Sequence, residues 1–135
     1  MNEKKLFVVA GVITHDKKIL CVQRGFNKYE YISKKFEFPG GKIEKNERYE
    51  DALKREIIEE LSMEIEIKRF IMTVEHKYPD FFLNMKVFLC STENKSLSLS
   101  EHISYKWLKL SNLGKLDWAA ADIPVAKKLL SKGIF

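Results

Sequence analysis

Three acidic side chains in one short segment are the residues of this sequence best suited to chemistry. Glu56, Glu59 and Glu60 fall within an arc of about 100° on one side of a helix. Like charges at that spacing repel each other by about 0.2–0.5 kcal/mol per pair. One interpretation is therefore a bound cation that neutralises them. The other is a solvated helix face whose glutamates pair with lysines.

A glycine-rich turn just before this segment favours the bound cation. The Pro-Gly-Gly run at 39–41 ends a short predicted strand at 36–38, because proline cannot donate to a strand ladder and glycine permits unusual backbone angles. The turn can bring backbone carbonyls near the glutamates. Hard divalent cations bind carboxylate and carbonyl oxygens, and Mg²⁺ leaves positions for water and phosphate. We therefore expect a Mg²⁺ site for a diphosphate, where a carboxylate takes the proton of an attacking water.

The helix that carries the glutamates is predicted to end at about Leu61. Asn46 is its predicted N-cap, with Glu47 and Glu50 in the positively polarised first turn. Its core-facing stripe recurs every four residues, at Leu53, Ile57 and Leu61. The glutamates lie beside this stripe, so their cluster borders the core.

The other predicted elements are strands and one further helix. The strands are 6–13 and 19–23, joined as a hairpin, then 36–38, 65–74, 81–90 and 105–108, and the last helix is 123–130. The polar and aromatic segment 24–35 is a predicted loop at the border of a pocket. Strands and helices are interspersed without a regular βαβ repeat. An α+β fold with a mixed sheet between helices is therefore expected.

Length and composition limit the possible classes of protein. A chain of 135 residues is one expected domain, residues 1–135, with 45% hydrophobic and 32% charged residues, as in soluble globular proteins. No apolar run approaches the roughly 18 residues of a membrane span, and the longest, 6–13, leads into a polar turn rather than a cleavage site. We expect a cytoplasmic protein, a monomer or homodimer, without membrane association. Cys21 and Cys90 are expected to be small, reduced core residues.

The net charge of +5 suits a polyanionic partner. The basic residues are scattered among acids, without a basic block or an aromatic-basic RNA motif. We therefore expect a small-molecule nucleotide substrate and no stable nucleic acid partner.

The spacing of the acidic segment resembles a known motif. Gly41, five residues, Glu47, seven residues and then the run from Arg55 to Met63 resemble the Nudix box of hydrolases that cleave nucleoside diphosphates linked to another group. The resemblance implies a Nudix-type α/β/α sandwich with a central mixed β-sheet. Ser62 departs from the pattern, which has glycine there. If the left-handed conformation is kept, serine costs on the order of 1 kcal/mol.

The resemblance also implies a role for each residue of the box. Mg²⁺, or Mn²⁺, would be held by the carboxylates of Glu56, Glu59 and Glu60 and by the carbonyl of Gly40. These glutamates would be the catalytic residues, with Glu56 assigned to orient or deprotonate the attacking water. Glu47 and Arg55 would form a structural ion pair that holds the loop against the helix.

Further segments resemble the MutT branch of the family. They are 21–25, 36–42, 78–80, Glu101-His102 followed by Trp107, and 118–124. The last is most similar to bacterial CTP pyrophosphohydrolases, whereas oxidised-guanine triphosphatases usually carry Asn at the position of Asp122. The likeness implies Glu101 as a further metal ligand or alternative base. The implied substrate-binding residues are Arg24, Glu37, Lys42, Phe81 and Asp122.

The substrate-binding residues have separate expected tasks. Arg24 and Lys42 would meet phosphates. Asp122 would read the base, and because an ionised carboxylate only accepts hydrogen bonds, it favours a base that presents donors, such as the cytosine amine. Guanine also presents donors, so this residue excludes thymine-like edges better than it separates cytosine from guanine. Phe81 and Tyr31 would stack on the base or pack in the core.

The leading hypothesis is a Mg²⁺-dependent nucleoside triphosphate pyrophosphohydrolase that acts on CTP, dCTP or a modified pyrimidine nucleotide. The second is an 8-oxo-dGTP diphosphatase. A non-catalytic nucleotide-binding sensor is the alternative from another class, and an RNA 5′-end pyrophosphohydrolase is a further one.

Overall fold

A computed structural model describes residues 4–134 of the chain. One mixed sheet contains the strands β1 (Lys5–His15), β2 (Lys18–Arg24), β3 (Phe36–Glu37), β4 (Gly40–Lys42), β5 (Glu66–Lys77), β6 (Phe82–Ser91) and β7 (His102–Lys109). The helices are α1 (Tyr49–Leu61), α2 (Ile123–Lys132) and the 3₁₀ segments η1 (Leu110–Lys115) and η2 (Ala120–Asp122). The strand order is β3-β2-β1-β6-β5, with β4 also beside β1 and β7 also beside β2. Only β1 and β6 pair in parallel among these strands.

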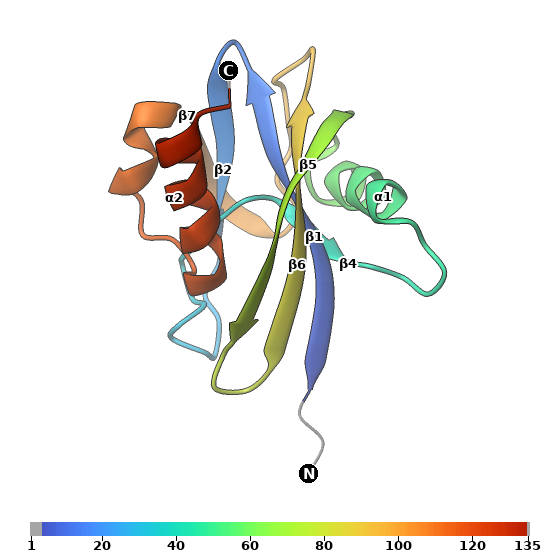
Figure 1. Ribbon diagram of the computed structural model, residues 1–135, viewed down its shortest axis with the longest axis vertical. Helices are drawn as coiled ribbons and strands as arrows, with labels where there is room; N and C mark the ends of the chain where they lie inside the picture. The colour runs from blue at the N-terminus through green and yellow to red at the C-terminus, as the bar shows by residue number, and fades with distance from the viewer. Residues whose placement is uncertain (1–3, 135) are drawn as a thin grey trace.

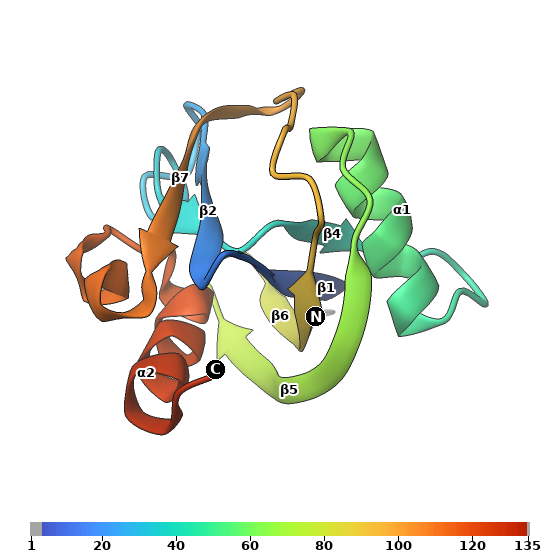
Figure 2. The same ribbon diagram turned by 90° about the horizontal axis from the view of Figure 1, so that it is seen from above.

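The sheet lies between the two long helices, with α1 on one side and α2 on the other (Figures 1 and 2). β1 shows why both faces are apolar. Val9 and Ile13 belong to the core cluster that includes the buried face of α1, and Ala10 and Val12 belong to the cluster that includes α2. A strand covered on both faces reads as a continuous apolar run. The predicted α+β fold, an α/β/α sandwich with a central mixed sheet, is therefore confirmed.

The sheet divides beside β1, and this division places the glycine-rich segment. β2 pairs with β1 only near their hairpin, through Thr14↔Ile19 and His15↔Lys18, and it then pairs with β3 and β7. β4 takes the place beside β1, with Ala10 opposite Gly40. A Cβ on Gly40 would overlap the backbone of Val9, so only glycine fits this close approach. The sequence predicted a turn here and did not predict β4.

α1 begins later than predicted. Its N-cap is Arg48, so the prediction of Asn46 as N-cap is wrong. Asn46 has φ of 65°, a left-handed conformation that asparagine tolerates better than most residues. The tight turn at Asn46 places Glu47 before the helix rather than in its first turn.

Ser62 ends α1 in the left-handed conformation that the sequence predicted for this position. Its φ is 53° and its ψ 40°, and its amide donates to the Ile58 carbonyl at 3.0 Å. We expect Ser62→Gly to raise the free energy of unfolding by about 1 kcal/mol, because glycine adopts this conformation without a Cβ clash. Urea denaturation measures the change. Ser62→Ala is the control: alanine keeps a Cβ, so an equal gain from it would contradict this explanation.

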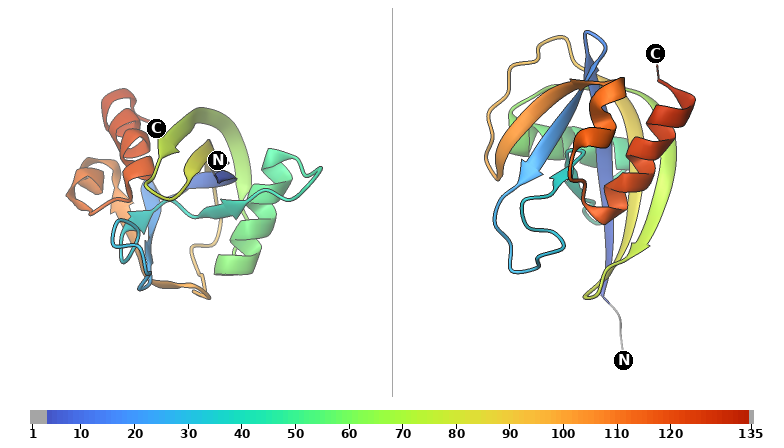
Figure 3. Two further views of the ribbon diagram at one scale, coloured as in Figure 1. Left: turned by 90° about the horizontal axis from the view of Figure 1, so that it is seen from below. Right: turned by 90° about the vertical axis from the view of Figure 1, so that its left-hand side faces the viewer.

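The remaining features of the fold are the position of α2 and the state of the two cysteines. α2 and the 3₁₀ segments before it cover one side of the sheet (Figure 3). Cys21 and Cys90 are buried free thiols, and burial raises the pKa of each to about 12. No helix within residues 4–134 is long and apolar enough to cross a membrane.

Candidate active site

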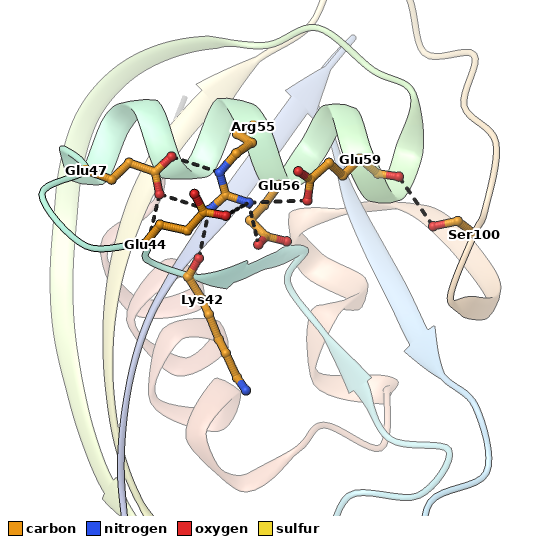
Figure 4. Close-up of polar contacts among 7 residues, drawn as sticks. All are labelled: Lys42, Glu44, Glu47, Arg55, Glu56, Glu59 and Ser100. Carbon is orange, nitrogen blue, oxygen red and sulfur yellow. Dashed lines mark hydrogen bonds and ion pairs between the residues drawn. The ribbon is translucent and has the colours of Figure 1, made fainter.

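Arg55 and Glu47 join the loop before α1 to the helix itself. The Arg55 Nε donates to Glu47 Oε2 at 2.8 Å and its second terminal nitrogen donates to Oε1 at 2.9 Å, a bidentate pair (Figure 4). The side chains are only 23% and 16% exposed. Hydrogen bonds from Arg55, with a further one from the Glu44 amide, lower the pKa of Glu47 to about 2. Arg55 also donates to the Lys42 carbonyl at 3.0 Å, which ties β4 to the helix.

The same guanidinium contacts two of the predicted metal ligands. Arg55 donates to Glu56 Oε1 at 2.9 Å and to Glu59 Oε2 at 3.2 Å. Glu59 is 56% exposed, whereas Glu56 is 12% exposed and lies over β4. A Cβ on Gly41 would overlap the Glu56 carboxylate, so this glycine leaves the room that the carboxylate occupies.

Glu60 carries the least satisfied carboxylate of this helix. Its Oε2 is buried and has no hydrogen-bond partner. Burial, followed by the charges of Glu56 and Glu101, raises the pKa of Glu60 to about 8. Glu37 also acts on Glu60 as a neighbouring negative charge, and Arg24 as a positive one. Carboxylates from α1, β3 and the segment before β7 are therefore close enough to Glu60 for their charges to act on it.

Glu101 reaches this place because the segment before it is hydrogen-bonded to the end of α1. The Ser98 amide donates to the Leu61 carbonyl at 3.0 Å, and the Ser100 amide donates to the Glu60 carbonyl at 3.2 Å. The Ser100 hydroxyl contacts the carbonyls of Glu59 and Glu60 at 3.4 and 3.3 Å. The serine-rich composition of 91–100 predicted only a polar connection and gave no sign of this docking.

These carboxylates do not already surround one common point. Among residues 4–134, no group of three or more His, Cys, Asp or Glu side chains has the geometry of a metal site. Arg55 accounts for part of this arrangement, because Glu56 and Glu59 both turn an oxygen toward it. The donor set nevertheless suits a hard divalent cation: it consists of carboxylates, one with a buried oxygen that lacks a partner.

Asp122 lies near Glu37, whose charge also acts on the cluster of glutamates. It is 5% exposed, and its Oδ1 accepts a hydrogen bond from the Phe38 amide at 3.0 Å. Burial and the charge of Glu37 raise the pKa of Asp122 well above its usual range. The neighbouring Ala121 amide donates to the Tyr78 hydroxyl at 2.9 Å. The end of β3 and the following Phe38 thus lie close to a residue that is more than eighty positions away in the sequence.

An aromatic group borders Asp122. The rings of Tyr31 and Phe81 both pack against the ring of Tyr78, with ring centroids 5.3 and 5.0 Å from that of Tyr78. The Tyr31 hydroxyl donates to Asp80 at 2.6 Å. Tyr31 and Phe81 are both partly buried against the core, so their predicted stacking on a base stays a prediction.

Lys42 is the predicted site residue that the structure separates from the others. Its side chain is exposed and extends away from Arg55 and the glutamates, while only its backbone carbonyl joins their network (Figure 4). Arg24 lies closer to the cluster, with a terminal nitrogen 3.4 Å from Glu37 Oε1. His102, for which the sequence gave no separate role, has its Nε2 2.9 Å from Glu37 Oε2.

Comparison with known proteins agrees with this architecture. The NUDIX domain family matches residues 5–129. The 8-oxo-dGTP diphosphatase of Proteus vulgaris is 36% identical over 100 residues, which cover 73% of this chain and 87% of that protein. The CTP pyrophosphohydrolase of Escherichia coli strain K12 is 27% identical over 128 residues, or 95% and 93% of the two chains.

A solved structure of a Nudix hydrolase is also similar to this chain in fold and in sequence. The solution structure of MutT, a Nudix family hydrolase from methicillin-resistant Staphylococcus aureus 252, is 38% identical with a TM-score of 0.75, and the match covers 98% of this chain and 100% of that one. The family match spans nearly the whole chain, and Glu56, Glu59 and Glu60 of the box lie on one helix beside the glycine-rich strand. The chain belongs to the NUDIX family and is a Nudix hydrolase.

Proposed function

We propose that this protein is a Mg²⁺-dependent nucleoside triphosphate pyrophosphohydrolase, which converts a nucleoside triphosphate and water to the monophosphate and pyrophosphate. We propose CTP, dCTP or a modified pyrimidine nucleotide as its substrate. The observation that carries the proposal is the buried, unpartnered oxygen of Glu60, which lies close to the charges of Glu56 and Glu101.

The proposed metal ligands are the carboxylates of Glu56, Glu59, Glu60 and Glu101 and the carbonyl of Gly40. Nudix hydrolases generally use a divalent metal, and carboxylate oxygens suit Mg²⁺, with Mn²⁺ as a substitute. When bound, the metal polarises a phosphoryl oxygen and offsets the negative charge that develops on it.

The side chains of the chain itself supply the remaining steps. Glu56 orients the attacking water and accepts its proton, a task that Gly41 supports by leaving room for the carboxylate. Arg24 binds phosphate oxygens, because it is partly exposed at the edge of the carboxylate cluster. Arg55 and Glu47 hold β4 and its loop against α1 and take no part in the chemistry.

Asp122 is the proposed reader of the base. The Phe38 amide fixes its Oδ1, so its orientation is set before a nucleotide binds. In its ionised form Asp122 accepts hydrogen bonds only, which favours an amino group such as the cytosine N4. Donors on a bound base stabilise this form against burial and the charge of Glu37, which raise the pKa of Asp122.

The second candidate substrate is 8-oxo-dGTP. Two observations favour it: relatives in Proteus vulgaris and Escherichia coli carry the name 8-oxo-dGTP diphosphatase, and guanine also presents N1 and N2 donors to a carboxylate. Asp122 by itself does not separate the two candidates, so the choice between them is an experimental one.

We expect Asp122→Asn to lower kcat/KM for CTP by about 10- to 100-fold, because one good base contact discriminates by about 1–3 kcal/mol. The amide oxygen can still accept from the Phe38 amide, so thermal stability should change little. For 8-oxo-dGTP the loss should be smaller if its oxidised base accepts hydrogen bonds from the new amide. The control is Asp117→Asn, an exposed aspartate paired with Lys35. Equal losses in both variants would contradict the proposed role.

Pyrophosphate release from canonical and oxidised nucleotides in Mg²⁺ and in Mn²⁺ tests the proposed reaction. The expected result is metal-dependent release with CTP, dCTP or 8-oxo-dGTP as the preferred substrate. Nucleotide binding without any release would instead indicate a sensor. Faster trimming of triphosphorylated RNA than of free CTP would indicate an RNA-processing enzyme.

A further inference from the structure

His102 is a buried residue of the site that the proposed reaction does not use. Its side chain is 5% exposed, although it lies at the start of β7 beside the exposed Glu101. Its Nε2 is 2.9 Å from Glu37 Oε2. Its Nδ1 is buried and has no hydrogen-bond partner. A polar ring with one strong contact and one unused nitrogen is an uncommon arrangement in a core, where most polar groups are paired.

The strand register explains how His102 reaches Glu37. β2 lies between β3 and β7, with Val22 opposite Glu37 on one side and Arg24 opposite His102 on the other. The pairing of β2 with β7 shifts between Gln23 and Arg24, as at a β-bulge. Such a shift redirects side chains, and bulges are common next to active sites. Three neighbouring strands therefore each contribute one member of a chain of contacts, Arg24–Glu37–His102.

The chemistry of the contact fixes the direction of the hydrogen bond. A carboxylate oxygen only accepts hydrogen bonds, so in this contact the His102 Nε2–H is the donor and Glu37 Oε2 is the acceptor. The other oxygen of Glu37 faces Arg24 at 3.4 Å. Donors on both sides hold the carboxylate in one orientation. The Arg24 side chain is 43% exposed, so the buried imidazole is the more rigid of the two supports.

The position of Glu37 makes its orientation consequential. Its charge acts on Glu60, a proposed metal ligand, and on Asp122, the proposed reader of the base, which the amide of the neighbouring Phe38 contacts. Glu37 therefore lies near both parts of the proposed site. A carboxylate in that place repels phosphate oxygens and attracts hydrogen-bond donors. The nucleoside of a bound nucleotide offers two kinds of donor, sugar hydroxyls and base amino groups.

We propose that His102 is a positioning residue of this active site: its Nε2–H fixes the Glu37 carboxylate so that Glu37 accepts a hydrogen bond from the nucleoside of the substrate. The role rests on the proposed nucleotide hydrolysis and extends it to a residue that touches neither metal nor phosphate. Loss of the imidazole should therefore weaken nucleotide binding more than it slows the chemical step.

The test compares variants of His102 and Glu37 in one thermodynamic cycle. We expect His102→Leu to raise KM for the preferred nucleotide by about 10- to 100-fold, as for the loss of a hydrogen bond to a charged group, with a smaller change in kcat. His102→Gln keeps a donor at similar reach and should recover most of the loss. If His102 acts through Glu37, the double variant His102→Leu/Glu37→Gln is no worse than Glu37→Gln alone.

Ser104→Ala is the matched control for strand pairing. Ser104 lies two residues further along β7, and its hydroxyl donates to Gln23 on β2 at 2.6 Å, so this variant removes a contact between the same strands without touching Glu37. It should leave KM unchanged. A His102→Leu effect no larger than that of Ser104→Ala, or losses from His102→Leu and Glu37→Gln that simply add, would overturn the proposal. A larger loss with CTP than with dCTP assigns the donor to the 2′-hydroxyl. Equal losses with those two but a smaller loss with 2′,3′-dideoxy-CTP assign it to the 3′-hydroxyl, and equal losses with all three assign it to the base.

A measurement without turnover separates this inference from the proposed function. ¹⁵N NMR of the histidine-labelled, ligand-free protein should show a proton on His102 Nε2, and Glu37→Gln should shift that signal. A proton on Nδ1 alone, with Nε2 bare, would overturn the positioning role even in an active enzyme. A wild-type protein that hydrolyses no nucleotide would overturn the proposed reaction instead, and the NMR result would be unaffected.

Discussion

Glu60→Gln is expected to lower kcat by about 10³-fold while the protein remains folded. The carboxylate is the most buried of the proposed metal ligands, and a metal that polarises a phosphoryl oxygen contributes several kcal/mol to catalysis. Glutamine has nearly the same shape and is neutral in a place where burial and like charges disfavour the anion. Thermal unfolding without added metal should therefore change little.

The measurement is pyrophosphate release as a function of Mg²⁺ concentration. Glu60→Gln should raise the Mg²⁺ concentration needed for half-maximal rate, and Glu56→Gln should lower kcat by about 10²–10⁴-fold, the usual contribution of a general base. Glu50→Gln is the matched control, because Glu50 lies in the first turn of the same helix, where its carboxylate is 3.8 Å from the exposed Arg48. If both Glu56→Gln and Glu60→Gln leave Mg²⁺-dependent turnover unchanged, the assignment of the site is wrong.

The second large effect concerns two adjacent glycines that the structure uses for different purposes. A Cβ on Gly41 would overlap the end of the Glu56 side chain, whereas a Cβ on Gly40 would overlap the backbone of Val9 in β1. A side chain can rotate away, but a paired backbone cannot without separating the strands. We therefore expect Gly41→Ala to lower kcat by about 10²-fold or more, by displacing the proposed base, with little loss of stability. Gly40→Ala should lower the free energy of unfolding by about 3 kcal/mol or more.

Urea denaturation and steady-state kinetics on both variants separate the two effects. Gly114→Ala is the control for the substitution itself, because a Cβ there would meet its nearest neighbour at an ordinary 3.8 Å. A folded Gly41→Ala enzyme with wild-type kcat would show that the position of Glu56 against β4 is not needed for turnover. A Gly40→Ala protein as stable as wild type would contradict the close approach of β4 to β1.

Local sequence was a good guide where the relevant contacts are local. The spacing of Leu53, Ile57 and Leu61 predicted the buried face of α1, which the structure confirms. The left-handed conformation at Ser62 followed from its place after the helix. Asn46 is the local error: asparagine suits an N-cap and a left-handed turn almost equally, and the turn formed by 44–47 decided between them.

Contacts between distant segments were beyond local reasoning. The run 39–41 has the composition of a turn, yet its glycines form β4 because β2 leaves β1 after the hairpin and opens a place there. The serines before Glu101 bring that residue to α1 through backbone hydrogen bonds that any polar segment of the right path could make. The part of Arg55 in holding Glu56 and Glu59 also depends on the final position of its side chain.

The sequence by itself determined that Glu56, Glu59 and Glu60 share one side of a helix, because residues three or four apart on a helix face the same way. The resemblance of this segment to the Nudix box then indicated the reaction class. Only the tertiary structure decided what surrounds that helix. Pairing of β3 with β2 sets Glu37 near both Glu60 and Asp122, and pairing of β7 with β2 brings His102 into contact with Glu37. The physical reason is that helical periodicity is a property of neighbouring residues, whereas strand pairing depends on the folding of the whole chain.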